Sequence, residues 1–261
     1  MKDTILNFYG FSQLPFGKDI TPKEVFPTAS GNDASAMLEL GLENEDIMVI
    51  IGPVGCGKSL ILRSATLGFD SNEYQVIYLR GSISKPSELF KLILGGMKIN
   101  PPYSMSKAKP VFYNAVAGAT RKPVIVLDDA QDTAPEALLM LKSMTNFEAD
   151  SRNLITFILA GQPELATILN YSHFEPLRTR IRLFHQLTGM SLEETAGYID
   201  HRLKIVHREE DLFSDAAKSE IFKQSNGIPR KINSLCYLAI LRGAIRQKRI
   251  LDTLDIPQDE G

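Results

Sequence analysis

Cysteine is scarce in this chain of 261 residues, and tryptophan is absent. The two cysteines, Cys56 and Cys236, lie far apart and have no CxxC spacing. The sequence therefore holds neither a disulfide framework nor a recognisable zinc motif. Because disulfides are characteristic of oxidising compartments, this composition favours a reducing one, and we expect a cytoplasmic protein.

Long hydrophobic runs and a strong excess of one charge are also missing. No apolar run reaches the roughly 18 residues that a membrane-spanning helix needs, and the first residues lack the apolar centre of a signal peptide. We therefore expect no membrane segment within the chain. Lys and Arg number 29 against 31 Asp and Glu, a formal net charge of −2. Any contact with DNA would have to come from a local basic patch.

Short apolar stretches alternate with stretches of helical spacing in the first two thirds of the chain. The expected strands, each buried on both faces, are residues 47–52, 75–79, 123–129 and 154–161. The expected helices are residues 59–67, 88–97, 111–119 and 135–146. Such alternation predicts an α/β fold with a parallel sheet and crossover helices.

The strand pattern stops near residue 188, and three helices follow. Each has a start signal, namely a capping box at Ser191 and Glu194, a serine cap at Ser214, and a proline at Pro229. The helices are expected to run to about residues 206, 224 and 248. We therefore expect two domains, an α/β core over residues 1–187 and a small all-helical subdomain over residues 188–261.

The strongest functional signal is the sequence GPVGCGKS, which follows an expected strand and precedes an expected helix. It is a complete GxxxxGK[ST] motif, the P-loop, in the required context. Its backbone N–H groups converge on phosphate oxygens, Lys58 supplies positive charge to the β- and γ-phosphates, and the Ser59 hydroxyl can ligate Mg²⁺. The predicted ATP-binding residues are Gly52, Pro53, Val54, Gly55, Cys56, Gly57, Lys58 and Ser59.

Two adjacent acids, Asp128 and Asp129, end the expected strand VIVLDD some seventy residues further on. A P-loop needs a carboxylate on the metal side of the nucleotide, and Asp128 is the expected Mg²⁺ partner. Asp129 then lies where a general base would polarise the attacking water. Two acids at a strand end could alternatively form only a solvated turn.

Six segments occur in an order that resembles a known family. They are FYGFSQLPFG, GPVGCGKS, VIVLDDAQ, NFEADSRNLITFILAGQPEL, LRTRIRL and GIPRKIN. Together they resemble an AAA+ ATPase of the ExeA/GspA group, which includes general-secretion accessory ATPases and the short transposon-encoded ATPases of the TnsC, MuB and TniB class. The resemblance implies a P-loop NTPase sheet core with a helical lid, and Mg²⁺-dependent ATP hydrolysis.

The resemblance also implies roles for residues outside the P-loop. Gln162 falls in the region of the polar sensor 1 residue, with Thr156 and Glu164 as alternatives; Gln162 could instead be a plain strand-end cap. Arg230, in a GxPR segment, matches sensor 2 on the lid, or is a capped surface arginine. The aromatic segment 8–16 either flanks the adenine or packs into a core.

The arginine run, residues 177–182 with the sequence LRTRIR, resembles a segment of the same family. The arginines of that segment face the γ-phosphate bound by the next subunit. Such an arginine finger stabilises transition-state charge and exists only when subunits assemble. Arg178 and Arg180 are the preferred candidates, with Arg182 as a third. The alternative is that alternating arginines lie on the solvent face of a short strand.

One position departs from the family pattern. The family usually has Asp-Glu where this chain has Asp128 and Asp129, followed by Ala130 and Gln131. Because Asp is one methylene shorter than Glu, its carboxylate is set back, and small misplacements of catalytic groups are costly. We therefore expect slow ATP hydrolysis.

Two functions follow from the resemblance. The first is an ATP-dependent regulator of DNA transposition that oligomerises as a ring or helix on double-stranded DNA and recruits or activates a transposase. The alternative is an ExeA/GspA-type ATPase that assists secretion-system assembly. The chain ends about where the lid should end, which favours the first. The candidate residues for non-specific phosphate contacts are Arg80, Lys85, Lys107 and Lys109.

Overall fold

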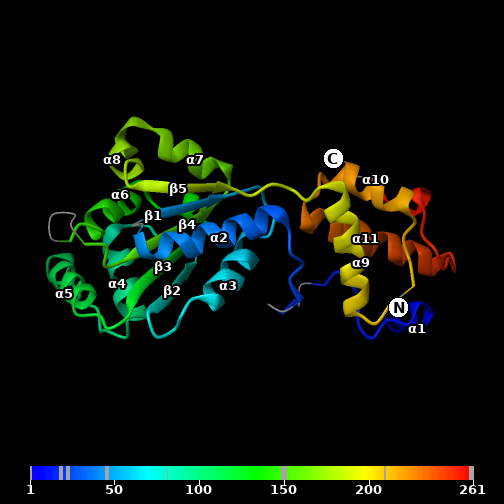
Figure 1. The fold of residues 1–261 in the computed structure, drawn as a ribbon, viewed down its shortest axis with the longest axis horizontal. Coiled ribbons are helices and arrows are strands. Elements are labelled where there is room, and N and C mark those ends of the chain that lie inside the picture. The colour runs from blue at the N-terminus through cyan, green and yellow to red at the C-terminus, as the bar shows by residue number, and fades with distance from the viewer. Residues whose placement is uncertain are drawn as a thin grey trace. The chain divides into compact units, whose positions relative to one another are not determined.

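The structure is a computed structural model that describes residues 2–17, 20–21, 24–44, 47–80, 82–147, 152–208 and 210–258. The chain forms two compact units. Unit 1 comprises Met1–Ser30, Val54–Gly57 and Thr188–Gly261, and unit 2 comprises Gly31–Pro53 and Lys58–Leu187. Figure 1 labels the elements of both units, and each unit is described by itself.

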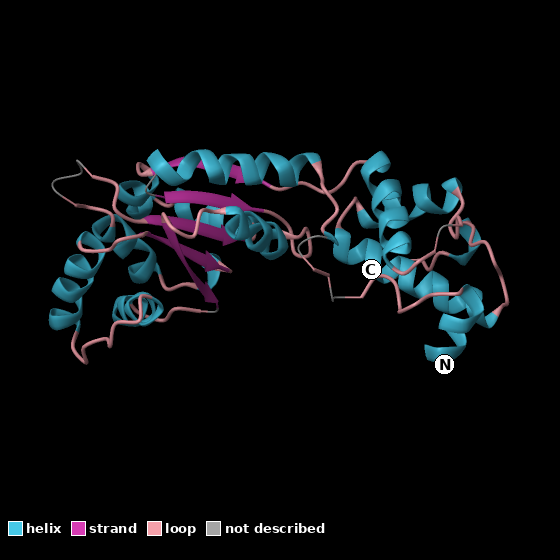
Figure 2. Cartoon of the chain, turned by 60° about the horizontal axis from the view of Figure 1, so that its bottom comes forward, coloured by secondary structure: helices cyan, strands magenta, loops and turns pink. Residues whose placement is uncertain are grey.

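Unit 2 is built on a five-stranded sheet in which every neighbouring pair is parallel. Its strands are β1 (Ile47–Ile51), β2 (Tyr74–Arg80), β3 (Lys122–Asp128), β4 (Thr156–Gly161) and β5 (Ile181–Gln186). Their order is β2-β3-β4-β1-β5. The strand arrows all point the same way (Figure 2), so their carboxyl ends share one edge of the sheet. The predicted parallel α/β fold is confirmed.

The strands differ from the prediction in two respects. β5 was not expected as a sheet strand, because its exposed and half-buried residues alternate and it has no continuous apolar run. The prediction that every strand is buried on both faces is wrong for β2, which is mostly half-buried. β2 pairs with β3 alone, so it is an edge strand.

Helices cover both faces of this sheet. They are α2 (Ala29–Asn44), α3 (Lys58–Gly68), α4 (Pro86–Gly96), α5 (Met105–Ala117), α6 (Pro135–Met144), α7 (Pro163–Asn170) and α8 (Glu175–Arg178), with short 3-10 turns η2 (Ala130–Asp132) and η4 (Ser172–Phe174). The expected helices correspond to α3, α4, α5 and α6. α5 begins six residues before its expected start and continues through Pro110.

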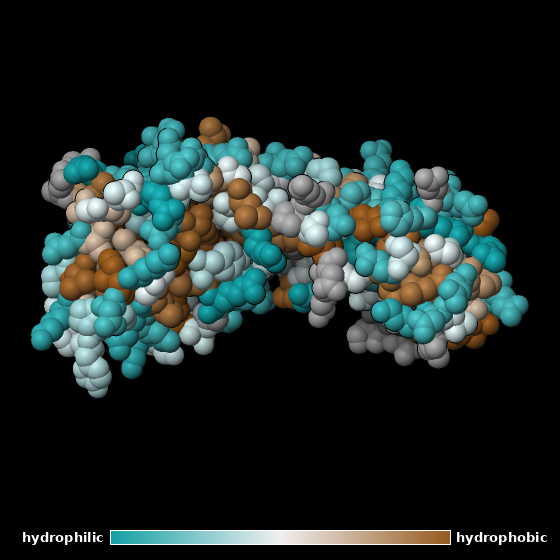
Figure 3. All heavy atoms as spheres, turned by 90° about the horizontal axis from the view of Figure 1, so that it is seen from below, coloured by the Kyte–Doolittle hydropathy of each residue, from teal (hydrophilic) through white to brown (hydrophobic). Residues whose placement is uncertain are grey.

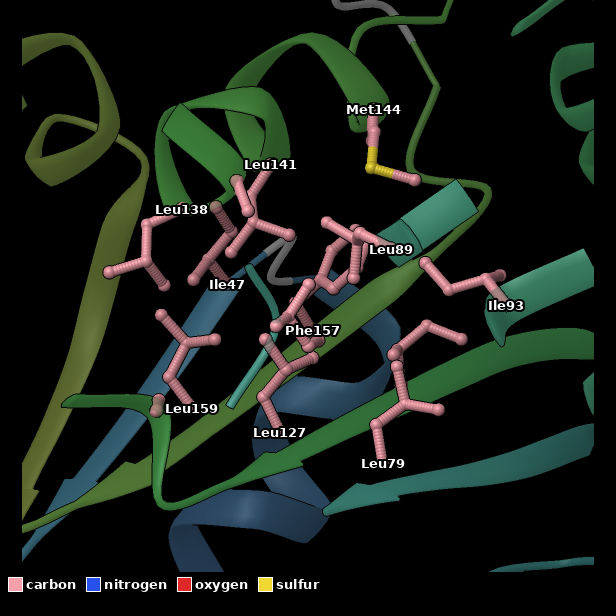
Figure 4. Close-up of a cluster of buried hydrophobic side chains, with 14 of the residues drawn as sticks. Ile47, Leu79, Leu89, Ile93, Leu127, Leu138, Leu141, Met144, Phe157 and Leu159 are labelled. Atoms are coloured by element: carbon pink, nitrogen blue, oxygen red, sulfur yellow. The ribbon is translucent and has the colours of Figure 1, made fainter. Parts of the chain in front are cut away.

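Alternation along the strands gives this unit two apolar layers. Odd-numbered strand residues such as Ile47, Leu127 and Phe157 point toward α4 and α6 (Figure 4). On the other face α2 comes close to β1, since a Cβ at Gly41 would lie 2.2 Å from the Met48 sulfur. The sheet is thus covered on both faces, and its carboxyl edge is where loops can present polar groups.

Unit 1 contains helices and no extended strand among its described residues. Its elements are α1 (Lys2–Tyr9), α9 (Leu192–Ile205), α10 (Asp215–Ser225), α11 (Pro229–Ile245) and the 3-10 turn η5 (Thr253–Asp255). The predicted caps are confirmed. The Glu194 N–H donates to the Ser191 hydroxyl at 3.1 Å, and the Ala217 N–H donates to the Ser214 hydroxyl at 3.2 Å. α11 ends three residues before its expected end.

The N-terminal segment belongs to unit 1, although the expected core of residues 1–187 placed it with the sheet. Tyr9, Phe11 and Phe16 are buried in one cluster with residues of α9, α10 and α11. The rings of Phe16 and Phe213 meet edge to face with centroids 6.4 Å apart. Of the two alternatives for these aromatic residues, the structure shows core packing.

Among the described residues, no helix combines the length and apolarity needed to cross a bilayer. On the face drawn in Figure 3, hydrophilic side chains surround limited hydrophobic patches in each unit.

Candidate functional site

The P-loop connects β1 to α3 and has the backbone that its glycines permit. Gly55 and Gly57 have φ angles of +83° and +101°, a region that residues with a Cβ rarely adopt. α3 begins at Lys58 and has 11 residues. The first N–H groups of a helix have no partner within the helix, so this N-terminus can bind an anion.

Lys58 is held against the start of the loop. Its side chain is 8% exposed, and its ammonium donates to the carbonyl oxygens of Gly52 at 2.7 Å and Pro53 at 3.1 Å. The Gly52 N–H donates to the Gly161 carbonyl oxygen at 3.1 Å, which ties the loop to the end of β4. A positive charge is thus fixed beside the phosphate-binding backbone.

Asp128 is the buried acid of this edge. It ends β3 and is 5% exposed. The Tyr78 hydroxyl donates to its Oδ2 at 2.7 Å, and the Asp129 N–H donates to its Oδ1 at 3.2 Å. Burial raises the pKa of Tyr78, and the hydrogen bond to the Asp128 carboxylate raises it further.

The sequence analysis did not single out Tyr78. Its contact depends on strand pairing, in which Tyr78 lies opposite Val126 and Arg80 opposite Asp128. The one signal in the sequence is a tyrosine near the end of an expected strand, and that signal is not specific.

The donors at this edge fit Mg²⁺. The Ser59 hydroxyl lies in the first turn of α3 and has no hydrogen bond within the described part of the chain. With the Asp128 carboxylate it provides the oxygen ligands that Mg²⁺ prefers, and Mg²⁺ usually needs only one or two carboxylates beside substrate phosphates. The described residues contain no group of three or more His, Cys, Asp or Glu side chains that could hold a metal ion. A bound Mg²⁺ would supply neutralisation of phosphate charge.

Asp129 is exposed and turns into solvent at the start of η2. Its backbone is left-handed, with φ 56° and ψ 44°, a conformation that Asp tolerates better than most residues. The Gln131 amide lies 3.5 Å from Asp129 Oδ1, and its Oε1 accepts the Gln162 N–H at 3.0 Å. Gln131 therefore joins the ends of β3 and β4, a role that the sequence analysis did not assign to it.

The three sensor 1 candidates lie at different places. Thr156 begins β4 and lies at its amino end, away from the P-loop. Gln162 caps the N-terminus of α7 directly after β4, and Glu164 is exposed in the first turn of α7. The structure thus brings Gln162 to the carboxyl edge and leaves Thr156 at the other edge.

The arginine run lies where β5 begins, at the amino ends of the parallel strands. The P-loop follows the carboxyl end of β1, at the other end of the strands. Arg178 ends α8 and donates to the carbonyl oxygens of Leu169 and Asn170 at 3.4 and 3.3 Å. Arg180 donates to the Thr145 hydroxyl at 3.2 Å, just before β5 begins. Only Arg182 lies exposed on a strand. Within one chain this run and the P-loop are therefore separated by the length of β5.

Arg230 lies in the first turn of α11. In unit 1, which includes the loop tip Val54–Gly57, its backbone N–H donates to the Gly55 carbonyl oxygen at 3.2 Å. A Cβ at Gly55 would lie 2.5 Å from the Arg230 Cβ. The GxPR segment thus meets the tip of the P-loop.

The expected DNA residues form two separate groups. Arg80 ends β2 and Lys85 precedes α4, and both are exposed. Lys107 and Lys109 are exposed on α5, which lies at the left of unit 2 in Figure 1, where the strands begin. These four cations do not make one patch.

A parallel sheet of order β2-β3-β4-β1-β5, with a P-loop after β1 and an acid at the end of β3, defines a P-loop nucleoside triphosphatase. Comparison with known proteins adds a similarity to a family. Residues 42–169 match a family model described as AAA domain. This match covers 128 of the 261 residues, so this part of the chain is similar to an AAA domain.

One curated relative covers most of the chain. General secretion pathway protein A of Aeromonas hydrophila is 26% identical over 247 residues, which are 92% of this chain and 45% of that protein. The chain thus spans less than half the length of this relative. This similarity agrees with the resemblance to the ExeA/GspA group that the sequence segments indicate.

Solved structures show the same fold at low identity. Cdc6p from Pyrobaculum aerophilum has a TM-score of 0.71 at 16% identity, covering 90% of this chain and 67% of that one. Aeropyrum pernix ORC2, in ADPNP-ADP complexes, has a TM-score of 0.66 at 15% identity and covers 92% and 69%. Aeropyrum pernix ORC1 in complex with DNA has a TM-score of 0.59 at 14% identity and covers 97% and 67%.

Proposed function

We propose that this chain is an AAA+ ATPase that regulates DNA transposition. It assembles on double-stranded DNA in its ATP state and recruits or activates a transposase. The observation that carries the proposal is the pairing of Arg80 with Asp128 across β2 and β3. An exposed cation thereby lies one strand away from the acid that would bind the metal, so DNA and nucleotide can share one edge of the sheet.

The nucleotide chemistry is assigned to the P-loop edge. Lys58 and the N-terminus of α3 bind the phosphates, and Ser59 and Asp128 hold Mg²⁺. Asp129 polarises the attacking water, with Gln162 and Arg230 as sensors near the γ-phosphate. Because Asp129 is short and exposed, hydrolysis is slow; a turnover matching fast motor ATPases would contradict this assignment.

The position of the arginines supports self-assembly. Arg178 and Arg180 lie at the edge of the sheet opposite the P-loop, so neither reaches the nucleotide of its own subunit. A neighbouring subunit that docks this edge against a P-loop would supply the finger, in a ring or a helical filament.

DNA affinity in such an assembly comes from repetition. Arg80 and Lys85 offer few phosphate contacts per subunit, but each subunit of a ring or filament repeats them along the duplex. Lys107 and Lys109 lie at the other end of the sheet and form the weaker candidate surface.

A second candidate is assistance to secretion-system assembly, and the similarity to General secretion pathway protein A favours it. This similarity does not separate the two candidates, because the ExeA/GspA group includes both classes. The partner decides between them, a DNA duplex and transposase in one case and a secretion assembly in the other.

Sedimentation and electron microscopy with random-sequence duplex DNA test the proposal. The nucleotide states are ATP, a non-hydrolysable analogue, ADP and none, each at low and moderate salt. We expect rings or filaments on DNA only with ATP or the analogue. Nucleotide binding without DNA association at either salt would contradict the transposition role and favour the secretion role.

A matched pair of double variants sharpens the result. Arg80→Ala with Lys85→Ala should weaken DNA association and its salt dependence, whereas Lys107→Ala with Lys109→Ala should change them less. The reverse order would move the DNA surface to α5.

A further inference from the structure

A tyrosine holds the buried acid of the nucleotide site. Tyr78 donates its hydroxyl to Asp128 Oδ2 at 2.7 Å, while the Asp129 N–H donates to Oδ1 at 3.2 Å. Asp128 itself is 5% exposed. Each carboxylate oxygen thus has one protein donor and keeps a further lone pair for another ligand.

We propose that Tyr78 is a positioning residue for Asp128, which fixes the plane of its carboxylate for Mg²⁺ binding. The proposal rests on the Mg²⁺-ATP site proposed above. Hydrogen bonds from outside a metal's own ligands commonly orient those ligands and tune metal affinity. A carboxylate held by a single backbone donor can rotate about its Cβ–Cγ bond, whereas a second donor on the other oxygen opposes that rotation.

The tyrosine ring is itself restrained. Tyr78 is half-buried in β2, and its backbone lies opposite Val126 in the sheet. The Arg80 guanidinium lies over the ring, 5.3 Å from its centroid, within cation–π range. Sheet pairing and this contact therefore set the direction in which the hydroxyl points.

Tyr78→Phe removes one oxygen atom and tests the proposal. The measurement is binding of a fluorescent non-hydrolysable ATP analogue, titrated with MgCl₂ and repeated in EDTA. We expect the Mg²⁺ concentration at half-maximal enhancement of binding to rise about tenfold, as is typical when such supporting contacts are lost. Affinity for the analogue in EDTA should equal that of the wild type, which also shows that the variant is folded.

Tyr74→Phe is the matched control on the same strand. Tyr74 is also half-buried in β2, but its hydroxyl makes no hydrogen bond with any described residue. We expect this variant to match the wild type in Mg²⁺ response and in EDTA.

Three results would overturn the proposal. In Tyr78→Phe, an unchanged or stronger Mg²⁺ response would mean that the hydroxyl does not position the metal acid. An equal loss of affinity in Mg²⁺ and in EDTA would indicate a purely structural role. A wild-type chain whose analogue binding ignores Mg²⁺ would contradict the metal site itself, and this proposal with it.

Discussion

The two units of the chain place their important residues in different ways. In unit 2 the two ends of the P-loop, Asp128 and Gln162 lie at or directly after the carboxyl ends of buried strands, and the parallel sheet gathers them at one edge. In unit 1 the core joins segments from the two ends of the chain, such as Tyr9 and Phe213. A motif within a few residues can define the first arrangement, whereas only the folded chain reveals the second.

The largest expected effect is on ATP turnover and concerns the arginines that lie at the amino ends of the strands, away from the P-loop. Arg178→Ala and Arg180→Ala should each leave nucleotide binding intact, and at least one should lower kcat of the assembled protein about 10³-fold, as for arginine fingers. ATP turnover above and below the assembly concentration measures this. Arg182→Ala, at an exposed position of β5, tests the third candidate; normal assembled activity in all three variants would make the trans-finger assignment wrong.

Core substitutions compare the two units directly. Phe157 in β4 is fully buried in unit 2, and Phe213 is 1% exposed in unit 1. Each change to Ala should cost about 3–5 kcal/mol of unfolding free energy, from lost burial and the cavity left behind. Calorimetry with a nucleotide analogue should show that Phe157→Ala lowers the temperature of the unfolding transition that the analogue stabilises. If Phe213→Ala lowered the temperature of that same transition equally, the two units would unfold as one.

In both units, sequence reasoning predicted the features that depend on residues close together in the sequence. The P-loop, four of the five strands and the caps at Ser191 and Ser214 depend on neighbouring residues, so a single sequence displays them. β5 was not predicted because half of its residues are exposed. The roles of Tyr78 and Gln131 were not predicted because both depend on contacts made in the folded sheet. The contact of Tyr78 with Asp128 depends on strand register, and the contact of Gln131 with Gln162 depends on the meeting of two strand ends.

The helix caps of unit 1 offer a smaller effect. Ser191→Ala removes the acceptor for the Glu194 N–H and should cost about 1 kcal/mol of unfolding free energy. Chemical denaturation measures the loss. Ser234→Ala, which alters an exposed serine within α11, is the control; a Ser191→Ala effect no larger than that of the control would argue against the cap.

The smallest expected effect is the pH dependence of unit 1. The Tyr9 hydroxyl donates to the Lys248 carbonyl oxygen at 3.0 Å, and burial, with the nearby Asp255 charge, raises its pKa from 10.0 to about 12. The unfolded chain therefore loses this proton first as the pH rises. Stability should be unaffected below about pH 10 and should fall between there and about pH 12.

Tyr9→Phe measures the contribution of that hydroxyl. Thermal unfolding should decline less steeply above pH 10 in this variant than in the wild type. Tyr103→Phe, at a 96% exposed tyrosine, is the control and should follow the wild type. Identical alkaline profiles for Tyr9→Phe and the wild type would contradict the assigned pKa.

The central claim is that the carboxyl edge of unit 2 binds ATP through Lys58. Isothermal titration of the wild type and of Lys58→Ala with a non-hydrolysable ATP analogue in Mg²⁺ tests it, with Lys142→Ala as the exposed-lysine control. The account predicts binding by the wild type and Lys142→Ala and none by Lys58→Ala at the same concentrations. Equal binding by all three proteins would contradict it.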